Sequence, residues 1–480
     1  MNQKMIKKIY FTIALFSCLS SFSQEIISST PIDLKKNVEV FAFVNEPTGQ
    51  TNLFFLNENE IKAFRLDDEM KFIDSLSTPS PEKGFSKMLG NTTSGNLINL
   101  FWSSNNQKKI ILQQYDFDKQ KISNKNFTLE FKNEIYLQEF SSENTFFILT
   151  LVKKSNAFKL YVFDNNGSLE VKDIDLSSTR FYHRADLYET FLESFMPFET
   201  PFSLEKINSK TPVSLVESAK KRKCYIENNQ LIITIDTNQN YTQLIEIDLV
   251  TYKATSKTIL QTPFKNFNTT NVKFNSFYLD SKIYQVKSSP NKFYMTIKDL
   301  NGNLLKEYMA NEEIAIDFKN SEINQQGNNF GGTGQKTLEH SSQFIRKVNN
   351  SNLGISCYAI KGNYMITLGS VSEQNSGGEA AMYGGMFGAV GVLLAYAISN
   401  PTLESFNSYS GRKSITIAGL FDKNDNHIQG EINPLAFDKI SIFFDENKKI
   451  KAQTLFRTDA YYLGYYDIYN KTYNLRKFED

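Results

Sequence analysis

The side chains best suited to acid–base chemistry or metal binding are few and scattered in this sequence. The three histidines, His183, His340 and His427, lie far apart, and none has a cysteine or carboxylate at the spacing of a zinc site. A nucleophile elbow of the form Gly-x-Ser-x-Gly is also missing. The sequence therefore predicts no catalytic residue, no metal ligand and no cofactor, and it favours a protein that is not an enzyme.

Two short motifs resemble ligand-binding loops. Residues 331–337 resemble a phosphate loop, but Gln335 stands where that loop needs the glycine before its lysine, so we expect no nucleotide. Residues 422–426 resemble the start of a calcium loop. The sixth and twelfth positions, which an EF-hand fills with Gly and Glu, are His427 and Asn433. A hairpin turn is the better interpretation of residues 422–426.

Carbohydrate chemistry is an alternative that the sequence leaves open. Propeller enzymes that cleave sugars use two carboxylates near the central axis, and nothing in this chain selects such a pair. Aromatic side chains could stack on sugars, but aromatics that alternate along strands favour sheet packing. The tyrosines near the C-terminus form one such group: Tyr461, Tyr462, Tyr465, Tyr466, Tyr469 and Tyr473. We interpret this region as the last blade, closing a ring with the N-terminal strand.

Composition limits the classes of protein to which the chain belongs. It has 480 residues, of which 40% are hydrophobic and 22% charged, as in a packed globular protein. The net charge of +1, from 53 basic and 52 acidic residues, gives no basic field for nucleic acid. The mean hydropathy of -0.38 excludes a polytopic helical membrane protein.

The N-terminus has the pattern of a secretory signal peptide. Lysines 4, 7 and 8 precede a short apolar run over residues 9–19, and the small residues Ser21 and Ser23 follow. We expect residues 1–23 to be removed and residues 24–480 to form the exported protein. A lipoprotein site at Cys18 is the alternative, disfavoured by the bulky Phe16. The location would then be the periplasm, the cell envelope or the medium.

Export permits disulfides, and two cysteines remain after residue 23. Cys224 and Cys357 both lie in strand-like sequence. We expect both to be buried free thiols.

Most of the chain alternates between short strand-like runs and turns rich in Asn, Asp and Gly. A turn that begins with Asp recurs at residues 164–167, 299–302 and 445–448, and Asn-Gly in such turns supplies the positive backbone dihedrals of tight hairpins. The runs form groups at a spacing of roughly 45 residues, as in propeller repeats. The expected strands are 38–44, 53–56, 61–66, 97–102, 110–115, 122–129, 146–152, 158–163, 169–174, 231–235, 244–249, 254–260, 277–286, 293–299, 304–309, 415–421, 440–444, 450–456 and 461–466.

This rhythm resembles a β-propeller. In general character the chain is similar to uncharacterised exported propeller-like proteins of Bacteroidota-type bacteria. The resemblance implies an all-β fold of about 6–7 blades over residues 24–480. It rests on rhythm, because the chain has neither a Trp-Asp dipeptide nor a kelch-like glycine series. A pair of β-sandwiches or a β-solenoid is the alternative architecture.

Two insertions interrupt this rhythm before residue 340. The first, residues 177–223, contains a capping box at Asp186 and Glu189 and an apolar stripe that predicts a short helix ending at Pro197. This helix would pack on the propeller or dock a partner. The basic run at 220–223 is expected to be a solvated loop. The second insertion, residues 324–337, is expected to be a loop rich in Gly, Asn and Gln.

The third insertion, residues 373–411, is apolar and rich in glycine. As a helix, residues 380–398 would be about 28 Å long, near the thickness of a bilayer core. Gly384, Gly388 and Gly391 fall on one stripe that permits close helix packing. The residues expected to contact a membrane or partner are Met382, Tyr383, Met386, Phe387, Val390, Leu393, Leu394 and Tyr396.

Topology argues against a simple membrane crossing by this insertion. The flanking runs, 364–371 and 412–421, resemble neighbouring strands of one sheet, which one crossing would separate. Residues 380–398 would then lie on a membrane surface, dock on an envelope protein or fold over the propeller. These observations predict an exported, non-enzymatic binding or scaffold protein of the cell envelope. A carbohydrate-binding protein or a polysaccharide-acting enzyme is the alternative.

Overall fold

The fold is built almost wholly from antiparallel strands. The computed structural model describes residues 25–34, 37–181, 186–194, 199–264, 271–329, 332–372, 397–398, 402 and 414–480. The predicted signal peptide, with Cys18, lies outside these residues. Within these residues four short helices accompany the strands: α2 (Leu187–Leu192), α3 (Leu215–Ser218), α4 (Ser341–Val348) and α6 (Ala436–Glu446).

The strands of the described residues form seven separate sheets, numbered here in chain order. Sheet 1 contains β2 (Glu39–Val44), β3 (Thr51–Leu56), β4 (Glu60–Leu66) and β5 (Phe72–Pro79). Sheet 2 contains β6 (Lys87–Ser94), β7 (Leu97–Ser103), β8 (Lys109–Asp116) and β9 (Lys121–Thr128), with β27 (Ala397–Ile398) added beside β6. Sheet 3 contains β10 (Glu134–Ser142), β11 (Thr145–Val152), β12 (Ala157–Phe163) and β13 (Leu169–Asp175).

The second half of the ring is less regular. Sheet 4 contains β14 (Glu205–Ile207), β15 (Arg222–Glu227), β16 (Gln230–Asn238), β17 (Tyr241–Asp248) and β18 (Ala254–Leu260). Sheet 5 contains β19 (Lys273–Leu279), β20 (Lys282–Ser289), β21 (Lys292–Asp299) and β22 (Leu304–Asn311). Sheet 6 runs in the order β25 (Asn352–Ile360), β26 (Asn363–Val371), β28 (Ser414–Phe421), β23 (Ile323–Asn329), β24 (Gly332–Leu338), with β29 (His427–Ile428) beside β28. Sheet 7 contains β30 (Lys451–Arg457), β31 (Tyr461–Asp467), β32 (Thr472–Phe478) and β1 (Ile26–Pro31).

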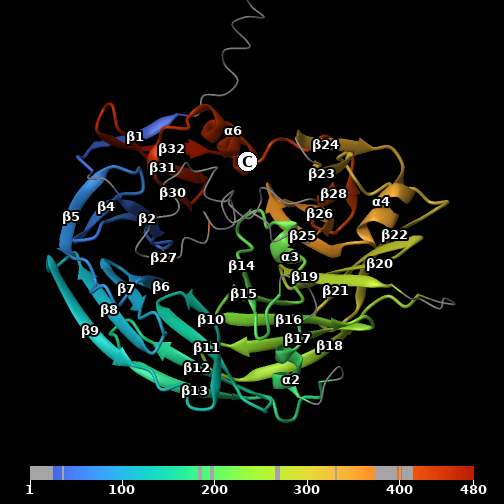
Figure 1. Cartoon of the computed structure of the whole chain (residues 1–480), viewed down its shortest axis with the longest axis horizontal. Coiled ribbons are helices and arrows are strands. Elements are labelled where there is room, and N and C mark those ends of the chain that lie inside the picture. The colour runs from blue at the N-terminus through green and yellow to red at the C-terminus, as the bar shows by residue number, and fades with distance from the viewer. Residues whose placement is uncertain are drawn as a thin grey trace, which may run out of the picture.

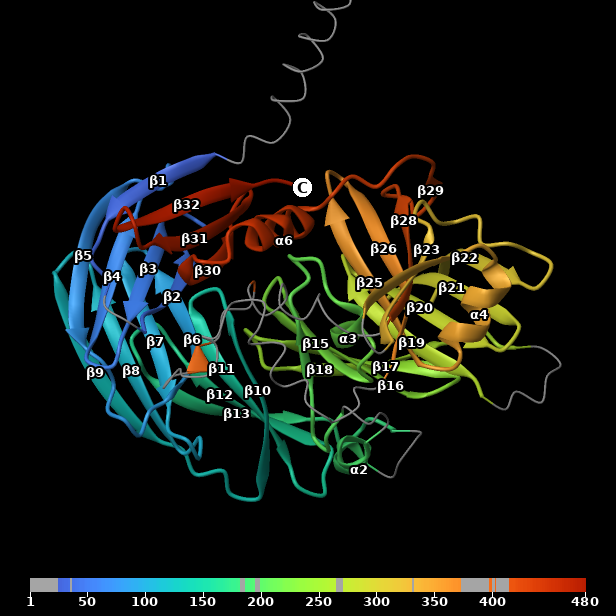
Figure 2. The ribbon, with the colours of Figure 1, turned by 45° about the horizontal axis from the view of Figure 1, so that its top comes forward.

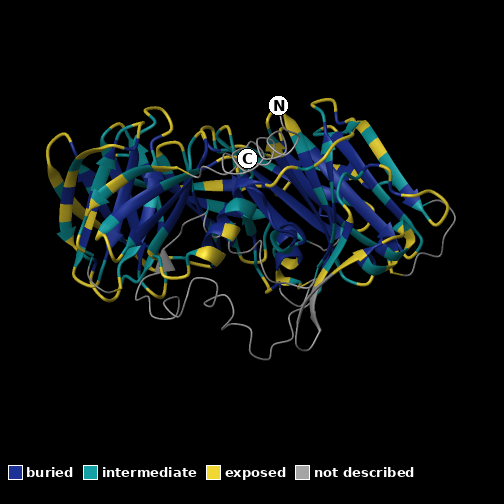
Figure 3. Cartoon of the chain, turned by 90° about the horizontal axis from the view of Figure 1, so that it is seen from above, coloured by how far each residue is buried: buried dark blue, intermediate teal, exposed yellow. Residues whose placement is uncertain are grey.

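The seven sheets follow one another around a centre, as Figure 1 shows. The first strands of sheets 1 to 3 lie nearest the centre, and β5, β9 and β13 lie at the rim (Figures 1 and 2). Neighbouring sheets pack face to face through apolar clusters, such as the one that joins sheets 1 and 2 around Phe54, Trp102 and Tyr115. Figure 3 shows the buried residues concentrated within the sheets, with exposed residues mainly in the connecting turns. The expected all-β, propeller-like architecture is confirmed.

The chain closes the ring by pairing its two ends. Strand β1 is antiparallel to β32, with Ser29 opposite Asn474 and Thr30 opposite Tyr473. Sheet 7 therefore combines three C-terminal strands with one N-terminal strand, which confirms the interpretation of the tyrosine-rich region as the closing blade. Because β1 covers this edge, β32 has no free edge on which another chain could pair.

Two of the predicted Asp turns have the expected local chemistry. The Asp164 carboxylate accepts the backbone N–H groups of Asn166 and Ser168, at 3.0 and 2.7 Å, and Gly167 has a φ of +69°. Asp299 makes the equivalent bonds, and Gly302 has a φ of +83°. Residues 422–426 form a hairpin turn between β28 and β29, also as expected.

Two expectations about local structure are wrong. Residues 440–444, predicted as a strand, belong to helix α6, because Phe437, Ile440 and Phe444 recur at helical spacing and bury one helix face against sheet 7. The supposed turn at 445–448 is therefore the end of this helix. The insertion at 324–337 is not a loop but the hairpin β23–β24, which pairs with β28.

The predicted pairing around the apolar insertion is confirmed. Strand β26 is antiparallel to β28 from Tyr364 opposite Phe421 to Val371 opposite Ser414. All the residues predicted to contact a membrane or partner, and the three glycines, lie outside the described residues. Ala397 and Ile398, expected at the end of a helix, instead form β27 in parallel with Lys87 and Met88 of β6. None of the helices in the described ranges has the length and hydrophobicity of a membrane span.

The helix predicted in the first insertion is present and internal. The Asp186 side chain accepts the Glu189 N–H at 2.7 Å, so α2 begins as expected. Leu187 and Phe191 are buried in a cluster shared with sheets 3 and 4, which confirms packing on the sheets. The helix ends at Leu192, earlier than the predicted Pro197. Cys224 and Cys357 are buried free thiols, as expected.

Candidate functional site: a central cavity between five sheets

The innermost strands of five sheets enclose a cavity of about 560 Å³. Its walls come from β2, β6, β10, β14 and β30, together with the loop after β14. Charged side chains of both signs line it: Glu46, Lys87, Glu139, Glu205, Lys206, Lys210, Glu217 and Arg457. A cavity of this volume lies within the range of small-molecule sites.

A β-bulge shapes the wall contributed by β10. Tyr136 is opposite Thr150 and Gln138 is opposite Leu149, so the strand contains one extra residue between them. The bulge places Tyr136 and Glu139 on the same face of the sheet, because Glu139 is opposite Ile148. The Tyr136 hydroxyl consequently donates a hydrogen bond to the Glu139 carboxylate.

Glu139 joins three neighbouring sheets. The Nζ atom of Lys87, from sheet 2, lies 2.7 Å from Oε1 of Glu139. Lys206, from sheet 4, donates to the Glu139 carbonyl at 3.2 Å. The neighbouring Gln138 donates to the Leu204 carbonyl at 2.9 Å, which fixes the same junction. The site therefore exists only where sheets 2, 3 and 4 meet.

The electrostatics of this junction keep Glu139 ionised. Burial alone would raise the pKa of its carboxyl group, but the ammonium groups of Lys87 and Lys206 hold that pKa below its usual range. Burial, together with the Glu139 charge, raises the pKa of Tyr136 well above its ordinary value. Tyr136 is accordingly a hydrogen-bond donor here and not a phenolate.

The part of the wall that β30 contributes carries a further cationic side chain. Arg457, at the end of β30, donates to the Lys210 carbonyl, and its guanidinium lies 5.3 Å from the centre of the Tyr461 ring. Lys210 itself pairs with Glu46. These contacts hold the loop after β14 against sheets 1 and 7.

The described residues contain no group of three or more metal-binding side chains. His340 begins helix α4, and His183 lies outside the described ranges. The ring of His427 contacts the Asn320 side chain at 2.9 Å, and burial lowers its pKa. The structure does not bring His340 and His427 into the central cavity.

The basic run at residues 220–223 does not form a solvated loop. Arg222 and Lys223 begin β15 and are fully buried. The Arg222 guanidinium donates to the carbonyls of Thr190, Phe191 and Glu193 at 2.8 to 3.1 Å, which satisfies the C-terminal end of α2. This contact caps α2 at its observed end, Leu192.

Sequence analysis singled out none of Lys87, Glu139, Lys206 or Arg457. The predicted strand groups correspond to β7–β9, β11–β13 and β16–β18, and they omit the strands on the inner side of each sheet, which are β6, β10, β14 and β15. Strands that line a polar cavity lack a continuous apolar pattern. The signal that could have located them is the stretch before each predicted group that was left without a strand, at residues 87–94 and 134–142.

Comparison with known proteins gives weak matches. No protein-family model matches the chain, and no curated protein does. A mutant of Synechocystis apocarotenoid oxygenase is similar with a TM-score of 0.30 and 7% identity, over 58% of this chain and 62% of that one. An ACO/RPE65 chimera gives a TM-score of 0.30 and 7% identity, over 57% of this chain and 62% of that one. The matches thus span less than two thirds of those proteins.

These comparisons do not support the predicted function and supply no replacement. The expected non-enzymatic envelope scaffold has no counterpart among them, because the solved structures found similar are oxygenases. Likeness at this level transfers neither an activity nor a site to this chain.

Proposed function

We propose that the protein recognises a small anionic polar molecule in the central cavity of a seven-bladed propeller. The observation that carries this proposal is how two cations in the cavity wall are bonded. Among the described residues, Lys206 and Arg457 bond backbone carbonyls, whereas Lys87 is already paired with Glu139. A cation whose hydrogen bond goes to a carbonyl keeps further N–H donors available to an acidic ligand.

The ligand should also carry hydroxyl or amine donors. An ionised Glu139 accepts such donors, and Gln138, Asn91 and Ser141 add further polar groups to the wall. The cations would bind the acid group of the ligand, and the Glu139 carboxylate would accept its hydroxyl or amine donors. This arrangement matches a hydroxylated or amino-substituted organic acid. With the predicted signal peptide at residues 1–23, the protein would meet this ligand outside the cytoplasm.

Calorimetric titration of the chain from residue 24 with citrate, glutarate and glucose 6-phosphate, at constant ionic strength, tests the proposal. At least one of these acids should bind, and Lys206→Gln and Arg457→Gln should each weaken binding about tenfold. Lys121→Gln, on the exposed rim strand β9, is the matched control and should leave binding unchanged.

The Glu139→Gln variant separates an anionic ligand from other ligands. This change frees Lys87 and removes a negative charge, while the glutamine carbonyl still accepts a hydroxyl, so an anion should bind as well or more tightly. Loss of binding in Glu139→Gln, together with unchanged binding in Lys206→Gln and Arg457→Gln, would overturn the proposal in favour of a cationic ligand.

A further inference from the structure

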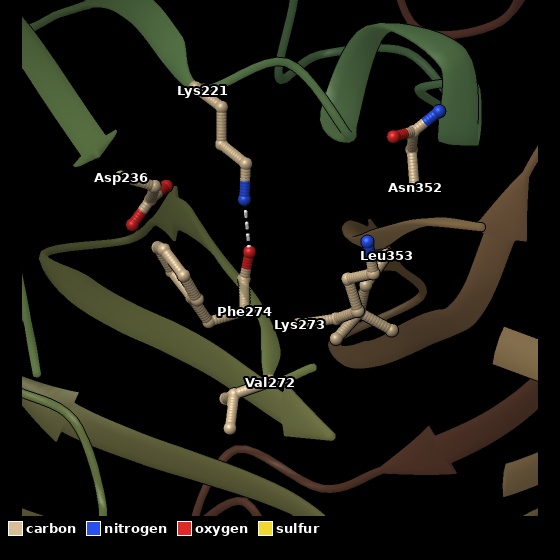
Figure 4. Close-up of a pocket in the computed structure, with 7 residues that line it drawn as sticks. All are labelled: Lys221, Asp236, Val272, Lys273, Phe274, Asn352 and Leu353. Atoms are coloured by element: carbon tan, nitrogen blue, oxygen red, sulfur yellow. Dashed lines mark hydrogen bonds between the residues drawn. The ribbon is translucent and has the colours of Figure 1, made fainter. Parts of the chain in front are cut away.

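A second, smaller cavity of about 180 Å³ lies near the starts of β15, β19 and β25, which belong to sheets 4, 5 and 6. Figure 4 shows its lining, which consists of Lys221, Asp236, Val272, Lys273, Phe274, Asn352 and Leu353. The lining residues come from three sheets, so the cavity is a product of the ring. It shares no lining residue with the central cavity.

Lys221 contributes an ammonium group without a carboxylate partner among the described residues. Its Nζ atom donates to the Phe274 carbonyl, and it lies 4.2 Å from the centre of the Phe274 ring (Figure 4). A protonated amine has three N–H donors, and one described acceptor leaves two of them to be satisfied.

Asp236 faces the same cavity but is occupied by other donors. Its Oδ1 accepts the Thr242 hydroxyl at 2.8 Å. Its Oδ2 accepts Lys223 at 3.2 Å and both the N–H and the hydroxyl of Ser276, at 3.0 and 2.8 Å. This carboxylate therefore neutralises Lys223 and has no capacity left for Lys221.

The local balance of charge is positive. Lys221, Lys223 and Lys273 lie near one another, and two carboxylates, Asp236 and Glu199, oppose them. Glu199 accepts the backbone N–H of Lys221 at 2.5 Å. Three ammonium groups against two carboxylates leave one positive charge at a cavity, which favours an anion there.

We propose that this cavity binds a small oxyanion, carrying a phosphate, sulfate or carboxylate group, between Lys221 and Lys273. Asn352 supplies a further donor from sheet 6, since one N–H of its amide is committed to the Val371 carbonyl at 3.3 Å and the other has no acceptor among the described residues. The site is independent of the one proposed for the central cavity. A bound anion would join the starts of β15, β19 and β25.

The chain offers a matched control for Lys221. Lys287 is a buried lysine that likewise donates to a carbonyl (Thr262, 3.0 Å) and lies over a phenylalanine ring (Phe264, 5.1 Å). Burial lowers the pKa of both lysines to about 8. Lys287 does not line this cavity. An effect that results from replacing any buried lysine should therefore appear in both Lys221→Gln and Lys287→Gln.

The test is calorimetric titration of the chain from residue 24 with inorganic phosphate, sulfate or acetate against chloride at equal ionic strength. Phosphate or sulfate should bind, Lys221→Gln and Lys273→Gln should each weaken binding at least about tenfold, and Lys221→Arg should retain it. Lys287→Gln and the rim variant Lys121→Gln should leave the binding of phosphate and sulfate unchanged. Binding no stronger than that of chloride, or an equal loss in Lys287→Gln, would refute the site.

A proton measurement gives a second readout. Asp236, Lys223, Glu199 and Lys273 face Lys221, and burial lowers the pKa of Lys221 to about 8. A bound anion raises this pKa, so sulfate binding near pH 8 should take up a fraction of a proton, measured in buffers of different ionisation heat. Lys221→Arg should bind sulfate without this uptake. Equal uptake in wild type and Lys221→Arg would contradict the role of Lys221.

Discussion

The Nζ atom of Lys223 lies 3.2 Å from Oδ2 of Asp236, and neither side chain is exposed to solvent. Lys223 also donates to the Lys220 carbonyl and to the Asn275 side chain, both at 2.6 Å. Asn275 in turn donates to the carbonyls of Ala219 and Leu353, at 2.6 and 3.0 Å. One buried ion pair thus connects sheets 4, 5 and 6.

Breaking this pair from one side should be costly. Lys223→Met and Asp236→Asn should each lower the free energy of unfolding by about 3–5 kcal/mol, because each leaves a buried polar group without its partner. The double variant should lose much less than the sum of the two. Urea unfolding followed by circular dichroism measures these differences. Lys132→Met, at the exposed pair with Glu130, is the control and should not shift the midpoint, whereas additive losses in the double variant would show that the two residues act separately.

Asp480 connects helix α6 with sheet 6. Its Oδ1 accepts the Ala436 N–H at the start of α6 at 2.9 Å, and its Oδ2 accepts the Tyr358 hydroxyl. Asp480→Ala should therefore lower the free energy of unfolding by about 1–2 kcal/mol, through loss of a cap and a buried hydrogen bond. The neighbouring Glu479→Ala, which removes only a surface pair with Lys477, should have no measurable effect in the same thermal unfolding assay. Equal destabilisation by the two changes would contradict the connecting role of Asp480.

The raised pKa of Glu39 predicts an unusual dependence of stability on pH. Burial raises the pKa of its carboxyl group from 4.5 to about 8 in the folded protein. Below pH 4.5 both states hold the proton. As the pH rises from there to 8, the unfolded state releases the proton first, so this group lowers stability by at most about 1.4 kcal/mol per pH unit.

Glu39→Gln should remove that slope. The variant should be more stable than wild type at pH 8 and nearly equal to it at pH 4, as measured by chemical unfolding across this range. Glu46→Gln, at an exposed carboxyl, is the control and should leave the slope in place. A wild-type profile identical to that of Glu39→Gln would show that Glu39 ionises normally.

Gly369 tests the pairing on either side of the apolar insertion. A Cβ atom at this position would lie 2.0 Å from the Ile415 carbonyl oxygen and 2.9 Å from the Leu215 side chain. Gly369→Ala should therefore destabilise the protein by about 1–3 kcal/mol or more, because β26 and β28 cannot separate without losing their hydrogen bonds. Gly84→Ala, where no atom lies within 4 Å, should be tolerated. A Gly369→Ala variant with wild-type thermal stability would mean that β26 and β28 do not pair in solution.

Local patterns in the sequence were sufficient for much of the fold. Alternating apolar residues identified β7–β9 and β11–β13, Asp164 marked the turn from β12 to β13, and Asp299 marked the turn from β21 to β22. These signals depend only on a residue and its neighbours. They failed at α6, where a short apolar run fits a strand and a helix equally well. They failed also at Arg222 and Lys223, because charged side chains are expected to be exposed to solvent unless their buried hydrogen-bond acceptors are known.

The sequence by itself determined the strand rhythm and the hairpin turns, since the chemistry responsible lies within a few neighbouring residues. Only the tertiary structure decided the two cavities and their charges. Lys87 and Glu139 are 52 positions apart, Glu139 and Lys206 are 67 apart, and Lys221 and Phe274 are 53 apart. Each of these contacts forms because closing the ring brings the innermost strands of different sheets together, and no local pattern records that approach.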